Sequence, residues 1–261
     1  FIGKLMDTQQ LKQSKILVVG DSCTDVHNYG TCDRISPEAP VLILKIEKTE
    51  SRPGMASNVL HALQRLGNKP SIITNSEKIT KERYVCSKSM QHVLRVDRGE
   101  NTPISSLDPK AVSLADYDCL VISDYNKGFL PHTVCKELVD HAISENKSVF
   151  VDTKKTDLSC FAGCFIKLNQ LEYERAKSFP TKSEVITTLG PMGARHGGKN
   201  YPTNKTEVFD VCGAGDSFLA AFVTSYMSFH NIPAAIHFAN KVATISVQNF
   251  GNYTPTLGEL G

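Results

Sequence analysis

Short apolar runs alternate with longer amphipathic segments along most of the chain. The runs at residues 15–21 (KILVVGD) and 119–123 (CLVIS) have a continuous apolar centre, which is typical of strands buried on both faces of a parallel sheet. Similar runs follow at residues 71–74, 148–152, 164–168 and 184–189. The pattern predicts a mostly parallel central sheet.

Two amphipathic segments have the period and length of helices. Residues 55–67 place apolar side chains on one helical face and end at Gly67, a common C-terminal cap. Residues 131–145 are long enough to cross between neighbouring strands. Strands that alternate with such helices predict an α/β fold with helices on both faces of the sheet.

Two β-rich stretches interrupt this alternation. Residues 39–48 and 91–99 have no crossover helix beside them, so we expect a small accessory sheet that stands off the main one. Residues 74–84 are polar and short, and we interpret them as a connection. The sequence contains no internal repeat and no low-complexity tract.

Composition and charge exclude several classes of function. The chain has 261 residues with 41% hydrophobic and 21% charged residues, as expected for a globular protein. Its 29 basic and 27 acidic residues nearly balance, with a formal net charge of +2. This balance argues against a nucleic-acid or membrane-surface binder, which would carry a large basic excess. No apolar run is long enough to cross a bilayer, and residues 1–15 do not resemble a signal peptide. We therefore expect a cytoplasmic protein.

Eight cysteines lie mostly within apolar runs. In a chain of this size they indicate buried, reduced thiols rather than a disulfide framework. Cys160 and Cys164 have the spacing of a possible metal pair. No second cysteine or histidine pair follows at a suitable distance, so a structural zinc site is disfavoured.

The segment DVCGAGDSFLAAFV, residues 210–223, carries the strongest chemical signal. Gly213, Ala214 and Gly215 leave their backbone N–H groups unhindered in front of an apolar helix that is expected to begin at Asp216. Such a helix start favours an anion. Asp216 could instead be an ordinary N-cap residue.

A phosphoryl transfer needs a cradle for the phosphate and a base for the attacking hydroxyl. The turn at residues 213–215 and the adjacent Asp216 would supply both from one segment. The chain contains no Walker-type lysine loop, so it is not a P-loop enzyme.

The segment DVCGAGDS resembles the signature of the PfkB, or ribokinase, family of sugar kinases. Other features of that family occur in the same order along the chain, at residues 52–67 (RPGMASNVLHALQRLG), 169–172 (NQLE), 188–193 (TLGPMG) and 238–240 (FAN). The resemblance implies a ribokinase-like three-layer sandwich over residues 1–261, with a small β-sheet lid at about residues 31–50 and 84–100. It also implies ATP as the phosphate donor and a small sugar as the acceptor.

A narrower resemblance rests on RISPEAPV, residues 34–41, which is similar to a subgroup that phosphorylates the anomeric hydroxyl of D-glycero-D-manno-heptose 7-phosphate. That subgroup carries this kinase beside an adenylyltransferase, and we recognise only the kinase here. Two alternatives stay open. The acceptor could be another sugar or a nucleoside, or the chain could bind nucleotide and sugar without catalysis.

The resemblance assigns roles around the nucleotide. Asp216 would be the catalytic base, with Gly213, Ala214 and Gly215 as the anion hole. Asn169 and Glu172 would order Mg²⁺ and its waters, although the same two residues also fit a capping box at a helix start. The remaining nucleotide contacts would come from Thr188, Gly190, Gly193 and Asn240. The alternatives are a glycine turn after a strand and, for Asn240, a polar residue on an exposed helix face.

The sugar contacts implied by the resemblance are Asp21, Asp25, Gly54, Asn58, Asp124 and Lys127. Asp21 could simply end a strand, whereas Asp25 is expected in a loop without a structural task. An acceptor that already carries a phosphate needs a basic partner, for which the candidates are Arg34, Arg52, Lys127 and Lys154, each of which could also be a surface charge. The lid would exclude water on closure, and a homodimer through the lid is expected.

The sequence departs from the family pattern in several places. Met55 replaces a second glycine, Cys212 replaces a threonine, and Thr153 replaces a proline. A strand–loop–helix insert is reduced between residues 74 and 81, and a helix is shortened between residues 174 and 184. These changes bear on the lid and the acceptor rather than on Asp216.

Overall fold

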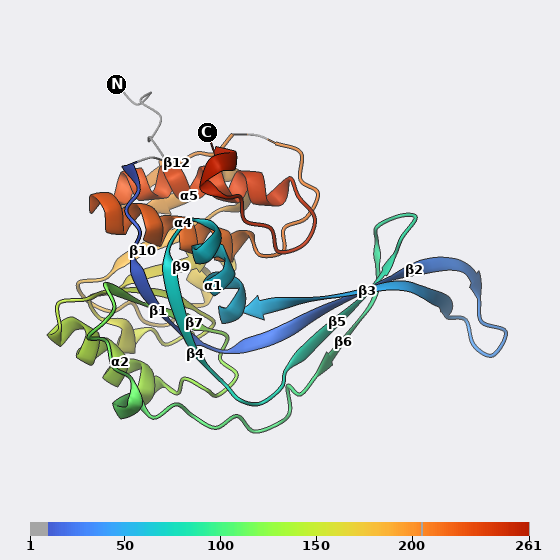
Figure 1. The fold of residues 1–261 in the computed structure, drawn as a ribbon, viewed down its shortest axis with the longest axis horizontal. Helices are drawn as coiled ribbons and strands as arrows, with labels where there is room; N and C mark the ends of the chain where they lie inside the picture. The colour runs from blue at the N-terminus through green and yellow to red at the C-terminus, as the bar shows by residue number, and fades with distance from the viewer. Residues whose placement is uncertain (1–9, 205, 261) are drawn as a thin grey trace.

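The central sheet orders the chain, as the computed structural model shows for residues 10–204 and 206–260 (Figure 1). Its strand order is β12-β11-β10-β9-β8-β7-β1-β4. The strands are β1 (Lys15–Gly20), β4 (Lys69–Thr74), β7 (Cys119–Asp124), β8 (Ser148–Thr153), β9 (Phe165–Asn169), β10 (Glu184–Thr188), β11 (Ala194–His196) and β12 (Lys199–Tyr201). All neighbours are parallel except β11, which is antiparallel to both β10 and β12. The predicted parallel sheet is confirmed.

Helices cover both faces of this sheet, as predicted (Figure 1). Alternate residues of β1 point to opposite sides, so Ile16 and Val18 belong to one apolar core and Leu17 and Val19 to the other. The first core contains side chains of α1 (Ala56–Arg65), α4 (Ala214–Phe229) and α5 (Ile232–Val247). The second contains those of α2 (His132–Ser144). Shorter helical segments are α3 (Gln170–Arg175) and 3-10 turns at Pro109–Ala111, Ser159–Phe161, Gly190–Met192 and Leu257–Leu260.

A second sheet of four strands projects from the body as the lid (Figure 1). Its order is β3-β2-β5-β6, with β2 (Ser22–Ile35), β3 (Leu42–Met55), β5 (Thr80–Cys86) and β6 (His92–Arg98). The lid is larger than predicted. The segment 74–84, interpreted as a connection, contributes most of β5, and β2 begins well before residue 31. Both strands carry polar side chains that pair across the sheet, so they lack the apolar run that marks a buried strand.

Two helix starts differ from the predictions. Helix α4 begins at Ala214 with Gly213 as its N-cap, two residues before the expected start at Asp216, because Gly213 supplies the left-handed turn with φ 73°. Helix α5 begins at Ile232, so Asn240 lies in its middle rather than at a helix start. Among residues 10–204 and 206–260, no helix has both the length and the hydropathy needed to cross a membrane.

Candidate active site

The candidate site lies at the carboxyl edge of the sheet, where open α/β sheets bind ligands. Asp124, Asn169 and Thr188 end β7, β9 and β10, and Asp21 follows β1. The first turn of α4 meets the same edge, because Gly213, Gly215 and Asp216 line one cavity together with Asn169 and Thr188. The structure therefore brings the predicted phosphate turn and the predicted nucleotide residues together.

The turn before α4 is crowded on one side and open on the other. A Cβ atom on Gly213 would lie 3.0 Å from Asn252 Oδ1 and from Asn58 Nδ2, so a side chain there would press on both amides. The Ala214 N–H donates to the Val211 carbonyl over a long 3.3 Å. Within the described residues, the N–H of Gly215 has no protein acceptor. The predicted anion hole thus keeps an available amide, although Ala214 is partly engaged.

Asp216 is a buried carboxylate in the first turn of α4, with 7% of its surface exposed. One oxygen accepts a hydrogen bond from Asn58 Nδ2 at 2.6 Å, and the other accepts one from the Tyr125 hydroxyl at 3.2 Å. The side chain does not cap the helix, so the alternative of an ordinary N-cap is wrong. Burial first, and then the charge of Asp152, raise the pKa of Asp216 to about 6. The group is suited to accept a proton near neutral pH.

A buried ion pair lies beside Asp216 and was missed in the sequence. Lys167 Nζ lies 2.5 Å from Asp152 Oδ2, and both side chains are more than 90% buried. Burial lowers the pKa of Lys167, but the charge and hydrogen bond of Asp152 raise it more, so the lysine stays charged. A Cβ on Gly215 would come within 3.0 Å of Lys167 Nζ, so the glycine lets the ammonium approach the first turn of α4. The sequence signal for this ion pair was a charged residue inside each of two apolar strands, Asp152 in β8 and Lys167 in β9.

Two neighbouring cavities form the cleft. The first, of about 580 Å³, has polar walls that include Lys154, Lys167 and Asp216. The second, of about 620 Å³, has mostly apolar walls, which include Val211, Phe218, Val208, Met192, Ala243 and Val247. Both are lined by Thr188, Gly190 and Gly215, so they adjoin. The arrangement suits a ligand with a flat apolar part and a charged end.

The predicted nucleotide residues line these cavities. Gly190 has φ 58° and open space where a Cβ would lie, whereas a Cβ on Gly193 would collide with the Tyr201 carbonyl at 2.1 Å. Asn240 also lines the apolar cavity. It is 6% exposed and donates to the Tyr201 carbonyl at 2.8 Å, so the alternative of an exposed helix face is wrong.

The predicted metal ligands are engaged with other groups. Asn169 and Glu172 form a reciprocal capping box at α3, with both hydrogen bonds at 2.8 Å. The second carboxylate oxygen of Glu172 binds Lys154. No group of three or more His, Cys, Asp or Glu side chains that could hold a metal occurs among the described residues. The capping box is compatible with the role predicted for Asn169 and Glu172, which is to order Mg²⁺ and its waters, and that role stays a prediction.

Three predicted sugar residues, Asp25, Gly54 and Asn58, lie where the strands of the lid join the body. Asp25 lies in β2 rather than in a loop, where it binds Arg83 Nη1 at 2.5 Å and accepts from Asn252 Nδ2 at 3.3 Å. A Cβ on Gly54 would lie 2.4 Å from the Asp25 carboxylate, so the glycine leaves room for that group. Asn58 holds Asp216 and thereby links this region to the phosphate turn.

The other three predicted sugar residues are differently placed. Asp124 is fully buried and binds Thr153, Lys155 and the Asn126 amide, so its carboxylate is used within the protein. Lys127 pairs with Glu100 at 2.8 Å. Asp21 accepts from the Tyr125 amide at 2.8 Å, and its other oxygen is buried without a partner in the described chain. Burial and the nearby Asp124 raise the pKa of Asp21.

The basic candidates are dispersed. Arg34 is exposed on the outer part of the lid, Arg52 pairs with Glu50, and Lys154 pairs with Glu172. The sequence reasoning missed Lys81, Arg83 and Arg95. Arg83 and Arg95 face each other in the β5–β6 ladder, and Lys81 Nζ lies 5.7 Å from the centre of the Tyr125 ring. The segment of Lys81 and Arg83 had no apolar pattern, and the β-rich stretch at residues 91–99 contained no motif that would have marked Arg95 as functional.

Comparisons with known proteins agree with this geometry. The profile described as "pfkB family carbohydrate kinase" matches residues 166–257. The bifunctional proteins HldE of Campylobacter curvus and Helicobacter hepaticus are 30% and 31% identical over 304 and 306 residues. Each match covers 95% of this chain, and the chain spans only 64% and 63% of the two relatives.

Solved structures share the fold. Ribokinase from Thermotoga maritima superposes with a TM-score of 0.70 at 18% identity, covering 95% of this chain and 98% of the other. Phosphofructokinase-2 from Escherichia coli in complex with potassium gives 0.74 at 16% identity, covering 95% and 97%. The architecture is therefore the ribokinase-like α/β fold with a lid sheet. Over residues 166–257 the chain is similar to the pfkB family of carbohydrate kinases, and over most of its length it is similar to the HldE proteins.

Proposed function

We propose that this chain transfers the γ-phosphate of ATP to a sugar hydroxyl, with Asp216 as the base. The observation that carries the proposal is the buried carboxylate at the start of α4, whose pKa is raised to about 6 and which is held by Asn58 and Tyr125 beside the shared wall of two cavities. A carboxylate in this state is ionised at neutral pH and can still accept a proton.

The surrounding residues suit the other requirements of this reaction. The apolar cavity would take the base of the nucleotide, and the polar cavity its phosphates. The amide of Gly215 and the ammonium of Lys167 would stabilise charge that develops on the transferred group. Asn169 and Glu172 would order a Mg²⁺ ion and its waters at the polar cavity, and the ion would neutralise phosphate charge.

We propose a sugar that already carries a phosphate as the acceptor, with D-glycero-D-manno-heptose 7-phosphate as the first candidate. The resemblance at residues 34–41 and the similarity to HldE proteins support this choice. The lid also offers basic side chains, because Lys81, Arg83 and Arg95 lie on the face that meets Tyr125. Arg83 pairs with Asp25 and Arg95 with Asp97, so a bound phosphate would compete with these carboxylates. Arg95→Ala should raise the KM for the acceptor, whereas Arg34→Ala should leave it unchanged.

A different acceptor is the second candidate, and Met55 is the observation in its favour. The Met55 side chain is 4% exposed and packs with Cys23 and Ile79 under the lid, where the family pattern has a glycine. It fills volume that a larger acceptor would need. A panel of sugars and nucleosides assayed for ADP release distinguishes the two candidates.

The test of the base compares Asp216→Asn with the matched surface variant Asp140→Asn, whose carboxylate pairs with Lys136 on α2. With ATP and the heptose phosphate, Asp216→Asn should lower kcat by about 10³-fold or more, and Asp140→Asn should leave it unchanged. For the wild type, kcat should rise with pH through about 6, as Asp216 loses its proton. Equal rates in the two variants would exclude this base. Nucleotide binding without ADP release from any acceptor would indicate a non-catalytic homologue.

We also propose that two copies pair through their lids in the cytoplasm. Four large apolar side chains are more than half exposed around the β2–β3 hairpin, and these are Ile35, Val41, Leu42 and Ile46. A second copy would cover them. Leu42→Lys should convert a dimer to a monomer in light scattering, whereas Met192→Lys, a change at an exposed residue of the body, should not. A wild-type monomer at all concentrations would overturn this proposal.

A further inference from the structure

Among the described residues, two pairs of cysteines are neighbours in opposite surroundings. Cys135 and Cys160 lie in the core between α2 and the 3-10 turn at Ser159–Phe161, with 0% and 3% of their surfaces exposed. Cys32 and Cys86 lie on the lid and are partly exposed. All four thiols are free. Only the lid pair is therefore reachable by a reagent in solution.

Strand pairing places the lid cysteines side by side. Gly30 lies opposite Cys86 in the parallel ladder of β2 and β5, and Cys32 follows two residues further along β2. Desolvation first, and then the neighbouring Cys86 thiol, raise the pKa of Cys32. The Ser87 N–H also donates to the Gly30 carbonyl at 2.7 Å, which fastens the end of β5 to β2. Backbone pairing of β2 with β5 therefore keeps Cys32 and Cys86 near each other.

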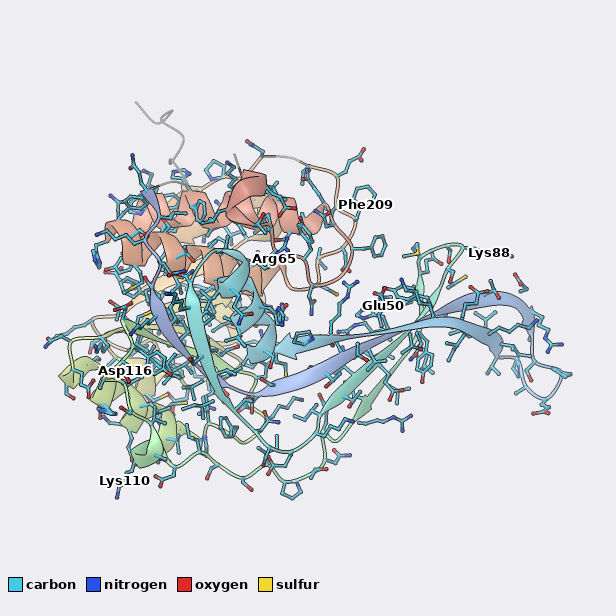
Figure 2. The ribbon with its side chains drawn as sticks, viewed as in Figure 1. Glu50, Arg65, Lys88, Lys110, Asp116 and Phe209 are labelled. Carbon is cyan, nitrogen blue, oxygen red and sulfur yellow. The ribbon has the colours of Figure 1, made fainter. Side chains whose placement is uncertain are left out.

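The turn after β5 activates one of the two thiols. The backbone folds back so that the Met90 N–H donates to the Cys86 carbonyl at 2.7 Å. Hydrogen bonding from the Ser89 backbone and hydroxyl and from the Lys88 backbone favours the thiolate, which lowers the pKa of Cys86 to about 7. Lys88, labelled in Figure 2, lies in this turn and pairs with Asp33 of β2 at 2.6 Å.

We propose that Cys32 and Cys86 are a site of reversible thiol–disulfide exchange with small disulfides such as oxidised glutathione. The Cys86 thiolate attacks one sulfur of the small disulfide, forming a mixed disulfide and releasing one thiolate, which takes up a proton. Cys32 then loses its proton and attacks the Cys86 sulfur, forming the Cys32–Cys86 bond and releasing the second thiol. Two protein thiols are oxidised and one small disulfide is reduced to two thiols, so atoms and electrons balance.

The consequence would be confined to the lid. A Cys32–Cys86 bond joins β2 covalently to the end of β5, next to the turn that leads to β6. The main sheet and the phosphate turn contribute no atom to it. Oxidation would therefore restrict the sheet that covers the acceptor without touching Asp216. In a reducing cytosol such exposed pairs are typically reversible and regulatory rather than structural.

The experiment equilibrates the whole chain with defined ratios of reduced and oxidised glutathione, traps free thiols by alkylation, and maps them by mass spectrometry. We expect one cross-linked peptide pair, Cys32 with Cys86, at oxidising ratios, and its full reversal by reduced glutathione. Hydrogen exchange in residues 80–98 should slow in the oxidised form. The Cys135 and Cys160 thiols should stay reduced and unalkylated until the protein is unfolded.

Two variants separate the roles of the thiols. In Cys32→Ser, Cys86 should stop at the mixed disulfide with glutathione, because the resolving thiol is gone. In Cys86→Ser, Cys32 should react at least about tenfold more slowly at pH 7 than Cys86 does in Cys32→Ser. If Cys32 and Cys86 were alkylated separately after equilibration with oxidised glutathione, or if Cys32→Ser left the fate of Cys86 unchanged, the proposal would be overturned.

Discussion

The body and the lid of this molecule are stabilised by different interactions. In the body, residues 16–19 of β1 and 119–122 of β7 are at most 1% exposed, and both faces of the sheet are covered by helices. In the lid, most residues of β3 and β6 are exposed or partly exposed, and ion pairs such as Asp25–Arg83 connect the strands. Burial of apolar side chains contributes more to stability than ion pairs at the surface. The body is therefore the more stable and rigid region, and the lid is the region that opens and moves more easily.

The functional groups divide in the same way. Asp216, Lys167 and Tyr125 belong to the body, where packing and buried hydrogen bonds hold them in place. The groups that would meet the acceptor, Arg83 and Arg95, belong to the lid. The chemistry is thus built on the rigid region, and the recognition of the acceptor on the region that can move.

The largest expected effect compares a core residue of the body with an apolar residue of the lid. Phe150 is fully buried and packs against Phe165 and Phe222, with ring centres 5.0 and 6.0 Å away. Phe150→Ala should lower the free energy of unfolding by about 4 kcal/mol. Leu94, on β6, is 56% exposed, so Leu94→Ala should change it by less than about 0.5 kcal/mol. Urea denaturation measures both, and similar losses would show that the lid has an apolar core of its own.

The next effect concerns the ion pair at the root of the lid. Arg83 and Asp25 are 13% and 8% exposed and lie 2.5 Å apart. Arg83→Met would leave the Asp25 carboxylate buried beside an apolar chain, at a cost of about 3 kcal/mol in unfolding free energy. The matched variant is Arg98→Met, which breaks an exposed pair with Glu82 on the same sheet and should give no measurable change. If Arg83→Met and Arg98→Met changed the free energy of unfolding equally, burial would not distinguish the contributions of the two ion pairs.

A smaller effect, of opposite sign, is expected at Asp216. Its folded pKa of about 6 lies above the usual value of 3.8, so the ionised carboxylate destabilises the native state above about pH 4. Asp216→Asn should therefore raise the free energy of unfolding at pH 7.5 by about 2 kcal/mol while activity is lost. The gain should shrink as the pH falls from about 6 and vanish below about 4. Urea denaturation at several pH values measures this gain in stability. If Asp216→Asn were no more stable than the wild type at pH 7.5, burial would not disfavour the ionised carboxylate of Asp216.

The sequence predicted the body far better than the lid, for a physical reason. Continuous apolar runs such as residues 119–123 can only be buried, so their strands and the mostly parallel sheet followed from the pattern, whereas the strand order did not. Strand β5 (TKERYVC) and most of β2 owe their place to backbone ladders and ion pairs, which leave no such pattern. At the site, Asp216 could be found from its own segment. A lysine inside an apolar strand was a signal for Lys167, but the position of Lys167 and Tyr125 beside Asp216 could not be predicted, because these contacts join parts of the chain far apart in sequence.

Met55 joins the two regions, and it gives the smallest and sharpest prediction. It is the last residue of β3, with φ 57° and ψ −130°, a conformation that favours glycine, yet its side chain is 4% exposed. Met55→Ala loses the buried side chain and keeps the backbone strain, so it should cost about 3 kcal/mol. Met55→Gly loses the same contacts but relieves strain of about 1–3 kcal/mol, less the entropy cost of glycine. The glycine variant should therefore be about 1 kcal/mol more stable than the alanine variant in urea denaturation, the reverse of the order at an ordinary strand position. If alanine were the more stable, the packing of the lid on the body, rather than the backbone, would determine the conformation at this residue.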